Sequence, residues 1–216
     1  MRFADRVDAG RRLASALHGE MPGDAVVLGL PRGGVPVAAV VAEQLGVPLD
    51  VLVVRKLGLP RQPELGLGAV GEDGVRVIND SLVASSGVSP DAMAVVERQE
   101  RAEVEARARR LRKGGATIDL RDRTVVLVDD GVATGSTMLA ACRVARARGA
   151  AKIVVAVPVG AGDALKRLRS VADEVICLAT PRRFVGVGQW YRNFRQTGEA
   201  EVVALLAEAR AQEESS

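Results

Sequence analysis

The sequence is short of the side chains on which much enzyme chemistry depends. Its 216 residues include one histidine and two cysteines, with no CxxC spacing and no Cys/His cluster. Cys142 and Cys177 lie far apart in the sequence and indicate neither a zinc site nor a disulfide framework. His18, at the end of a predicted first helix, can favour the helix C-terminus. Most histidine-based catalysis is therefore excluded.

Aromatic residues are also scarce, at 2% of the chain, although 48% of the residues are hydrophobic and 26% are charged. The core must then be built from Val, Leu and Ala, which is typical of parallel sheets covered by Ala-rich helices. No apolar run reaches the ~18 residues needed to cross a bilayer, and the first residues lack the apolar stretch of a signal peptide. We therefore expect a cytoplasmic protein with no membrane partner.

The net charge is small. The 30 Lys and Arg residues against 27 Asp and Glu residues give a formal charge of +3, which does not require a nucleic acid or a membrane as partner. A local anion-binding site explains this surplus equally well.

Val-rich apolar runs predict four buried parallel strands, at residues 25–30, 49–54, 124–130 and 152–159. The stretches between most of them have helical periodicity, so the chain is interpreted as repeated βα units with right-handed crossovers. The expected fold class is α/β, with a doubly wound and mainly parallel sheet in a single domain, 1–216. In such sheets ligands bind at the carboxyl ends of the strands, here after Leu30, Val54, Val128 and Val157.

The alternation breaks after Lys56, and a helical insertion is expected at about 60–118. Ser89 and Pro90 are suited to start a long helix that runs to about Lys113. Because most of its residues are charged, we interpret it as a solvated outer helix in preference to one that binds nucleic acid. An arm of a homodimer is a third reading.

The segment 125–137, VVLVDDGVATGST, carries the most specific motif. Apolar strand residues lead to the adjacent carboxylates Asp129 and Asp130, and a turn rich in Thr, Ser and Gly then opens a helix. Such a turn offers backbone N–H groups and hydroxyls to a phosphate, and Gly135 permits close backbone approach. Ribose hydroxyls are suitable donors to both carboxylates. The whole run therefore predicts a site for a ribose 5-phosphate.

This run resembles the motif with which type I phosphoribosyltransferases bind 5-phosphoribosyl-1-pyrophosphate (PRPP). The resemblance implies that Asp129 and Asp130 hold the 2- and 3-hydroxyls of the ribose. It also implies that the 5-phosphate is bound by Ala133, Thr134, Gly135, Ser136 and Thr137.

A second loop fits the same family. Arg32, Gly33 and Gly34 come directly before a helix and look like the pyrophosphate loop of these enzymes. Arg32 supplies a fork-shaped phosphate ligand, and the two glycines permit unusual backbone angles over an anion. The resemblance implies a cis peptide near Arg32 to Gly33.

Arg55 and Lys56 end the second predicted strand and resemble the Arg-Lys pair of adenine phosphoribosyltransferases, so they are expected to neutralise the pyrophosphate leaving group. Two departures leave the acceptor open. Ala133 stands where hypoxanthine-guanine enzymes usually carry an Asp, and QPELGLGAVGEDG stands where adenine enzymes have a YxxEYG-like segment. Glu64 in this segment is a candidate catalytic base, because a mobile loop could bring it close.

The segment PRRFVGVGQWYRNF, residues 181–194, resembles the hood of hypoxanthine-guanine enzymes, and a hood is expected at about 180–216. The resemblance implies that Phe184 and Val185 bind the acceptor, with Phe184 stacking on its ring. Trp190 and Tyr191 are weaker candidates. A small hydrophobic core of the hood explains these aromatics nearly as well.

Together the three loops predict one site for PRPP with Mg²⁺ at the strand ends. The expected activity is Mg²⁺-dependent transfer of the phosphoribosyl group to a small nitrogenous acceptor, a nucleobase, with release of pyrophosphate, as in nucleotide metabolism. Asp129 and Asp130 orient the ribose, stabilise its positive charge and are candidate ligands of the PRPP-bound Mg²⁺. Two alternatives stay open: a non-catalytic PRPP-sensing regulator that binds nucleic acid, and a structural protein that has kept the fold without the ligand.

Overall fold

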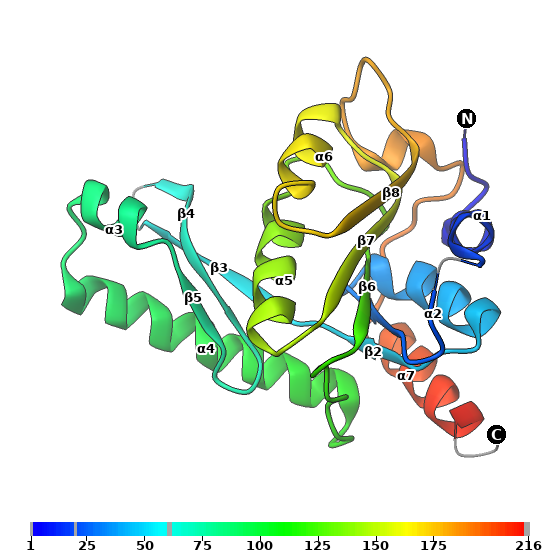
Figure 1. Ribbon diagram of the computed structural model, residues 1–216, viewed down its shortest axis with the longest axis horizontal. Coiled ribbons are helices and arrows are strands. Elements are labelled where there is room, and N and C mark those ends of the chain that lie inside the picture. The colour runs from blue at the N-terminus through cyan, green and yellow to red at the C-terminus, as the bar shows by residue number, and fades with distance from the viewer. Residues whose placement is uncertain (1, 20, 60–61, 214–216) are drawn as a thin grey trace.

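The computed structural model describes residues 2–19, 21–59 and 62–213, with the backbone alone for 59 and 62–66. The body is a five-stranded sheet of order β2-β1-β6-β7-β8 in which every neighbouring pair is parallel (Figure 1). Its strands are β1 (Val26–Gly29), β2 (Leu49–Val51), β6 (Thr124–Val128), β7 (Lys152–Val159) and β8 (Glu174–Ala179). The predicted α/β class with a parallel sheet is confirmed.

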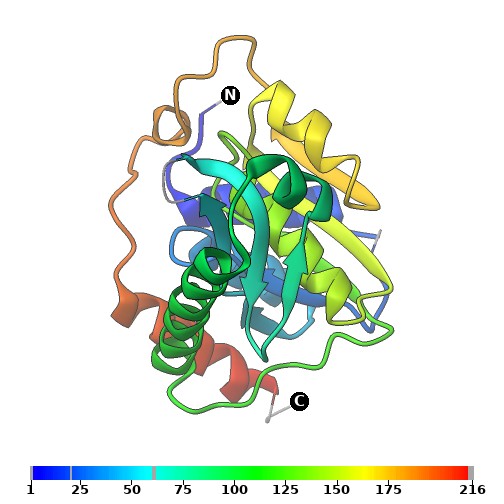
Figure 2. The same cartoon turned by 90° about the vertical axis from the view of Figure 1, so that its left-hand side faces the viewer.

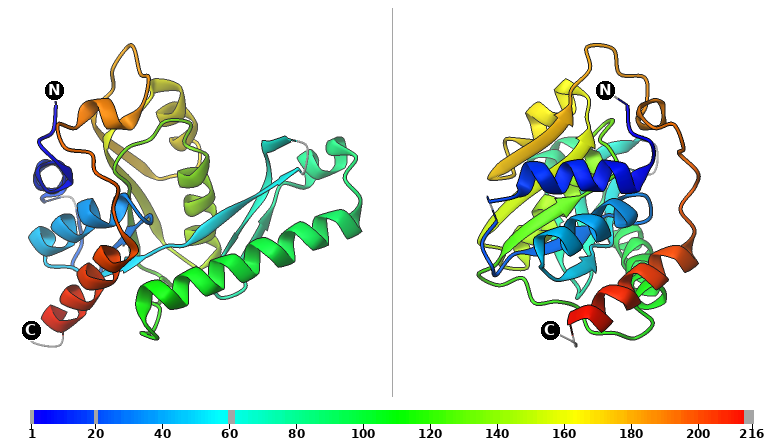
Figure 3. Two further views of the ribbon diagram at one scale, coloured as in Figure 1. Left: turned by 180° about the vertical axis from the view of Figure 1, so that it is seen from behind. Right: turned by 90° about the vertical axis from the view of Figure 1, so that its right-hand side faces the viewer.

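Helices cover both faces of this sheet, as buried parallel strands require. α1 (Arg6–Leu17) and α2 (Gly34–Leu45) lie on one face, and α5 (Ser136–Ala147) and α6 (Gly162–Leu168) lie on the other (Figures 1 and 3). No helix in the described parts of the chain is both long enough and apolar enough to cross a membrane.

The side chains of β6 alternate between the two faces of the sheet and pack in the hydrophobic cluster on each face. Val126 and Val128 pack in the cluster that includes α1 and α2, whereas Val125 and Leu127 pack in the cluster that includes α5 and α6. Successive side chains of a strand point to opposite faces, so a continuous apolar run serves two layers at once. This arrangement explains how a chain with few aromatics builds its core.

The segment between β2 and β6 forms an arm that projects from the body (Figures 1 and 3). The arm contains a three-stranded antiparallel sheet of order β3-β4-β5 and two helices. Its elements are β3 (Val54–Leu59), β4 (Gln62–Gly71), β5 (Arg76–Ile78), α3 (Asp80–Ser86) and α4 (Pro90–Arg112). The start of α4 is as predicted, because the Ser89 hydroxyl accepts a hydrogen bond from the Ala92 N–H at 3.2 Å.

The insertion expected at about 60–118 is therefore helical only in its second part, since the strands β4 and β5 precede the helices. Glycines within β4 weaken the strand pattern of its sequence. They are needed for close packing: a Cβ on Gly68 would collide with the carbonyl oxygen of Val77, and a Cβ on Gly71 would collide with the side chain of Val144.

The second predicted strand, 49–54, is divided between the two sheets, because β2 ends and β3 begins within it. The backbone N–H of Val53 donates to the Glu72 carboxylate at 2.9 Å, and the chain leaves the parallel sheet at this point. Arg55 and Lys56 consequently lie in the arm and not in a loop at the edge of the parallel sheet.

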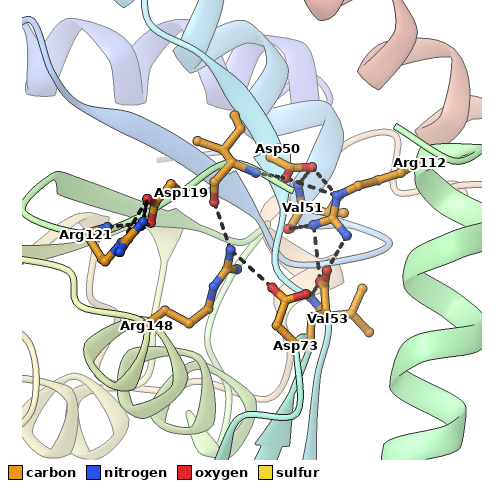
Figure 4. A network of polar contacts seen from close by, with 10 residues as sticks. Asp50, Val51, Val53, Asp73, Arg112, Asp119, Arg121 and Arg148 are labelled. Atoms are coloured by element: carbon orange, nitrogen blue, oxygen red, sulfur yellow. Dashed lines mark hydrogen bonds and ion pairs between the residues drawn. The ribbon is translucent and has the colours of Figure 1, made fainter. Parts of the chain in front are cut away.

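A buried arginine at the end of α4 joins the arm to the body (Figure 4). The Nε of Arg112 donates to Asp50 Oδ1 at 2.8 Å, and its Nη2 donates to the carbonyl oxygen of Val51 at 2.7 Å. Arg112 also forms an ion pair with Glu72. Burial raises the pKa of Glu72, and the hydrogen bond and charge of Arg112 act in the opposite direction. This cluster fixes the base of the arm beside β2.

The C-terminal segment expected as a hood at about 180–216 divides into two parts. Its first part contains the short 3-10 helix η1 (Val187–Trp190) and lies against the residues that follow β6. Its second part, α7 (Glu199–Glu213), packs against α2 and α4 (Figure 2). Glu213 Oε1 accepts from the N–H of Leu49, the first residue of β2, at 3.3 Å. Because α7 thus ends at the amino end of the sheet, only the first part is placed to cover a site at the carboxyl ends.

Candidate functional site

The two predicted loops that follow β1 and β6 are in contact. A Cβ on Gly33 would collide with the carboxylate of Asp130, and a Cβ on Gly34 would lie 2.8 Å from the Cα of Asp129. The absence of side chains at these two positions therefore lets the Arg-Gly-Gly loop, residues 31–34, lie directly against the carboxylate pair.

The two neighbouring carboxylates are both half-buried, and the pKa of each is raised. Burial is the main cause for Asp129, and the negative charge of Asp130 adds to it. Burial also raises the pKa of Asp130, although Arg6 acts in the opposite direction. Donors such as ribose hydroxyls, or a cation, would reduce the cost of ionising both groups.

Arg6, the first residue of α1, holds Asp130 and was not predicted. Its Nε and Nη2 donate to Asp130 Oδ2 at 2.9 and 2.7 Å, and its Nη1 donates to the carbonyl oxygen of Arg195 at 2.7 Å. The guanidinium also lies 4.2 Å from the ring centroid of Phe194. A cation in the first turn opposes the helix dipole. This unfavourable placement is the one signal in the sequence that pointed to a tertiary partner for Arg6.

The phosphate loop, residues 133–137, opens α5 at the same edge of the sheet. No described side chain caps this helix N-terminus, and Thr134 and Thr137 are exposed beside it. Gly135 has a φ of 73°, in the left-handed region that favours glycine. Backbone N–H groups and hydroxyls are therefore presented together, as an anion site requires.

Lys56 lies beside the phosphate loop, where its Nζ donates to Ser136 Oγ at 3.1 Å. Together with Arg143 of α5 and Arg167 of α6 it lines a cavity of about 320 Å³. Arg167 Nη2 also donates to the carbonyl oxygen of Thr134 at 2.8 Å. Sequence reasoning missed both arginines, because each comes from a helix face that carries no motif.

Arg55 lies on the opposite face of β3, where its Nε is 3.6 Å from the carboxylate of Glu100 on α4. Successive side chains of a strand point to opposite faces, so the expected Arg-Lys pair is divided and Lys56 does not share the place of Arg55. Arg32 follows a cis peptide between Pro31 and Arg32, one bond earlier than the sequence led us to expect.

The aromatic residues of the hood divide between a small core and the surface. Tyr191 is buried, its ring centroid lies 5.4 Å from that of Phe3, and its hydroxyl donates to the carbonyl oxygen of Asp130 at 2.6 Å. The alternative of a small hood core thus describes Tyr191. Phe184 is half-buried against the same cluster, and Val185 is 81% exposed. The role of these two residues toward an acceptor stays a prediction.

Glu64 lies in β4, but its side chain is outside the described part of the chain. Its assignment as a catalytic base stays a prediction.

The family model of the phosphoribosyl transferase domain matches residues 3–192. The chain belongs to this family. Two Mycobacterium tuberculosis proteins named as phosphoribosyl transferases, MT0597 of strain CDC 1551 and Rv0571c of strain H37Rv, are 58% identical to this chain over 208 residues. The aligned region is 96% of this chain and 47% of each relative, so the chain spans about half the length of these proteins.

Two solved structures are similar in fold to this chain. TT1426 from Thermus thermophilus is similar with a TM-score of 0.90 and 42% sequence identity, over 96% of this chain and 99% of that one. The similarity therefore includes the arm as well as the body. AQ2163 from Aquifex aeolicus has a TM-score of 0.50 and 13% identity over 85% of this chain and 76% of that one, which shows a shared fold alone.

The carboxylates of this phosphoribosyl transferase domain fit one mode of Mg²⁺ binding. No three His, Cys, Asp or Glu side chains gather into a metal site within the described residues. Mg²⁺ usually keeps several waters and is held by one or two carboxylates together with substrate phosphates. Asp129 and Asp130, side by side at the strand end, suit this shared coordination and not an all-protein cage.

Proposed function

We propose that the protein binds PRPP with Mg²⁺ and transfers the phosphoribosyl group to a nitrogenous acceptor, with release of pyrophosphate. The observation that carries this proposal is the contact between the carboxylate pair and the Arg-Gly-Gly loop, where Gly33 lies directly against the carboxylate of Asp130. With the phosphate loop at the same sheet edge, groups suited to a ribose, a pyrophosphate and a 5-phosphate all adjoin one another.

In the proposed reaction the bond between ribose C1 and the pyrophosphate oxygen breaks, and a bond between C1 and an acceptor nitrogen forms. The electron pair of the broken bond leaves with pyrophosphate, and the acceptor nitrogen passes its proton to a base, for which Glu64 is the proposed residue. Asp129 and Asp130 accept hydrogen bonds from the ribose hydroxyls and stabilise the positive charge that develops on the ring. Mg²⁺, when bound with the substrate, would neutralise charge on the pyrophosphate.

In this proposal, different cations of the protein bind the 5-phosphate and the pyrophosphate of PRPP. Lys56 lies beside the phosphate loop at 3.1 Å from Ser136 Oγ and supports the 5-phosphate. Arg32 and Arg55 lie on the side of the Arg-Gly-Gly loop and α4, and they support the pyrophosphate. The hood residues Phe184 and Val185 are the proposed contacts of the acceptor, which we take to be a nucleobase because a flat ring suits an aromatic face.

Calorimetric titration with PRPP and Mg²⁺ tests the proposal. Wild type should show saturable binding, and Asp129→Asn/Asp130→Asn should lose it. Asp119→Asn, an exposed carboxylate paired with Arg121, is the matched control and should bind as wild type does. A screen of nucleobases for pyrophosphate release would then identify the acceptor. Absence of saturable binding to wild type at millimolar PRPP would overturn the proposal.

The alternative of a sensor that binds nucleic acid through α4 has less support. Two arginines on this helix pair with glutamates of the same helix: Arg101 with Glu97 at 3.1 Å, and Arg109 with Glu105 at 3.8 Å. Such pairs reduce the positive field that a phosphate backbone would meet.

A further inference from the structure

One arginine of α4 reaches the Arg-Gly-Gly loop from the arm. The Nη2 of Arg107 donates to the carbonyl oxygen of Pro31 at 3.3 Å, across 76 positions of sequence. Its side chain is half-buried, while much of the rest of this helix is exposed. The helix that the sequence presents as a solvated outer element therefore places a cation at the predicted pyrophosphate loop.

Two further guanidiniums belong to the same region: Arg32 directly follows Pro31 in the loop, and Arg55 contacts Glu100, about two turns before Arg107 on α4. Burial is the main cause that lowers the pKa of Arg107, and the positive charges of Arg55 and Arg32 follow. Arg55 has Glu100 within 3.6 Å, and the neighbouring Arg110 has Glu199 within 3.2 Å. Among the described residues Arg107 itself forms no ion pair within 4.0 Å.

Arg32 and Arg55 repel the positive charge of Arg107, and Glu199 acts in the opposite direction. An anion with several charges would remove the repulsion among the arginines. Pyrophosphate is such an anion, and each of its phosphates can accept paired hydrogen bonds from a guanidinium. We propose that Arg107 is a pyrophosphate-binding residue, which completes a three-arginine cluster with Arg32 and Arg55. This inference rests on the proposed function and adds a residue to the same site.

The division of Arg55 from Lys56 leaves one cation of β3 on the side of α4, and a residue of α4 can supply a second. Lys56 Nζ bonds to Ser136 Oγ at 3.1 Å, on the side of the phosphate loop and on the opposite face of β3 from Arg55. Arg107 adds a cation to the pyrophosphate side, to which the sequence assigned Arg55 and Lys56 together. The arm therefore acts as a wall of the substrate site.

Separate titrations of the full chain with Mg²⁺-pyrophosphate and with ribose 5-phosphate test this inference. Arg107→Gln should weaken binding of Mg²⁺-pyrophosphate by about tenfold or more and change the affinity for ribose 5-phosphate by less than about twofold. Arg107→Lys keeps the positive charge but not the paired donors of the guanidinium, so it should lose less affinity for Mg²⁺-pyrophosphate than Arg107→Gln does. Arg109→Gln is the matched control on the same helix, since the Arg109 side chain is 72% exposed and should not affect either ligand.

The outcomes separate this inference from the proposed function. Unchanged affinity for Mg²⁺-pyrophosphate in Arg107→Gln, with both ligands bound by wild type, would overturn the role of Arg107 and leave the proposed function standing. Weakening of both ligands to the same extent in Arg107→Gln and Arg107→Lys would mean a general structural role, and would also overturn it. If wild type bound neither ligand nor PRPP, the proposed function would fail first and this inference with it.

Discussion

The guanidinium of Arg6 and the carboxylate of Asp130 link the first helix of the chain to the carboxylate pair at the end of β6. Arg6 Nη2 and Asp130 Oδ2 are 2.7 Å apart, and the two side chains are only 11% and 14% exposed. Burial raises the pKa of Asp130, and the hydrogen bond and charge of Arg6 oppose this rise. Arg6 therefore favours the ionised form of a carboxylate that the proposed reaction uses as a hydrogen-bond acceptor.

Replacement of Arg6 should move the pH dependence of PRPP binding. In Arg6→Gln the pKa of Asp130 rises further, because the charge that opposes the effect of burial is removed, so that binding requires a higher pH than in wild type. Loss of one partner of this buried pair should also lower the free energy of unfolding by about 3 kcal/mol. Titration calorimetry from about pH 5 to pH 8, with urea unfolding, measures both effects.

Two comparisons control this result. Arg6→Lys retains a cation and should restore part of the wild-type pH profile, whereas Arg12→Gln removes an exposed partner of Asp8 and should leave the profile unchanged. A pH profile of Arg6→Gln that coincides with that of wild type would show that Arg6 does not govern the ionisation of Asp130.

Asp129, a proposed ligand-binding residue, should reduce the stability of the folded protein at a pH above its folded-state pKa. Its pKa in the folded protein is raised well above the ordinary value, so the folded state binds more protons than the unfolded state over the interval between the two pKa values. Stability conferred by the protonated carboxyl is present below the unfolded pKa of about 3.9 and is lost as the pH rises through the folded pKa. The side chain of Asp129→Asn does not ionise, so the variant should not lose this stability as the pH rises.

Thermal unfolding near pH 4 and near pH 8 tests the prediction for Asp129. The melting temperature of Asp129→Asn should exceed that of wild type by a few degrees at the higher pH, since about 1 kcal/mol moves it by roughly 2–4 °C in a domain of this size. The difference should shrink at the lower pH. An equal advantage at both pH values would attribute the effect to packing and not to ionisation.

The body and the arm differ in how far their sequences reveal them. The parallel sheet could be predicted because its strands carry apolar side chains on both faces, as Val125 and Val126 do. β4 could not, because Gly68 and Gly71 leave out the side chains that mark a strand. Gly68 and Gly71 are needed because Val77 and Val144 approach them closely. These are tertiary contacts, which the local sequence pattern does not predict.

The residues of the candidate site also differ in whether the sequence alone could predict their positions. The carboxylates and the phosphate loop follow one another in sequence, so their proximity could be predicted. Arg6 and Arg107 reach the site from distant helices, and only the packing of α1 and α4 determines where they lie. Lys56 could be assigned to a strand end but not to a face, because the face depends on where the chain leaves β2 for β3.

The buried arginine that joins the arm to the body should be needed for stability. Arg112→Met leaves Asp50 and Glu72 buried without their cation, which should lower the free energy of unfolding by about 3–5 kcal/mol. The pKa of Glu72, already raised by burial, should rise further, so the variant should lose less stability at acidic pH. Urea unfolding of Arg121→Met, which breaks an exposed pair with Asp119, is the control and should match wild type. A small effect of Arg112→Met would mean that the base of the arm is held by apolar packing alone.

Arg55 and Lys56, adjacent in sequence, should affect opposite ends of the substrate. Lys56→Gln removes the cation beside Ser136 and should weaken binding of ribose 5-phosphate by about tenfold, with little effect on Mg²⁺-pyrophosphate. Arg55→Gln, on the face of β3 that meets α4, should show the reverse pattern. Each variant is the matched control of the other, because both replace one cation of the same strand. Loss of the same ligand in both variants would contradict the division of this pair, and would place both side chains in one subsite as the sequence alone suggests.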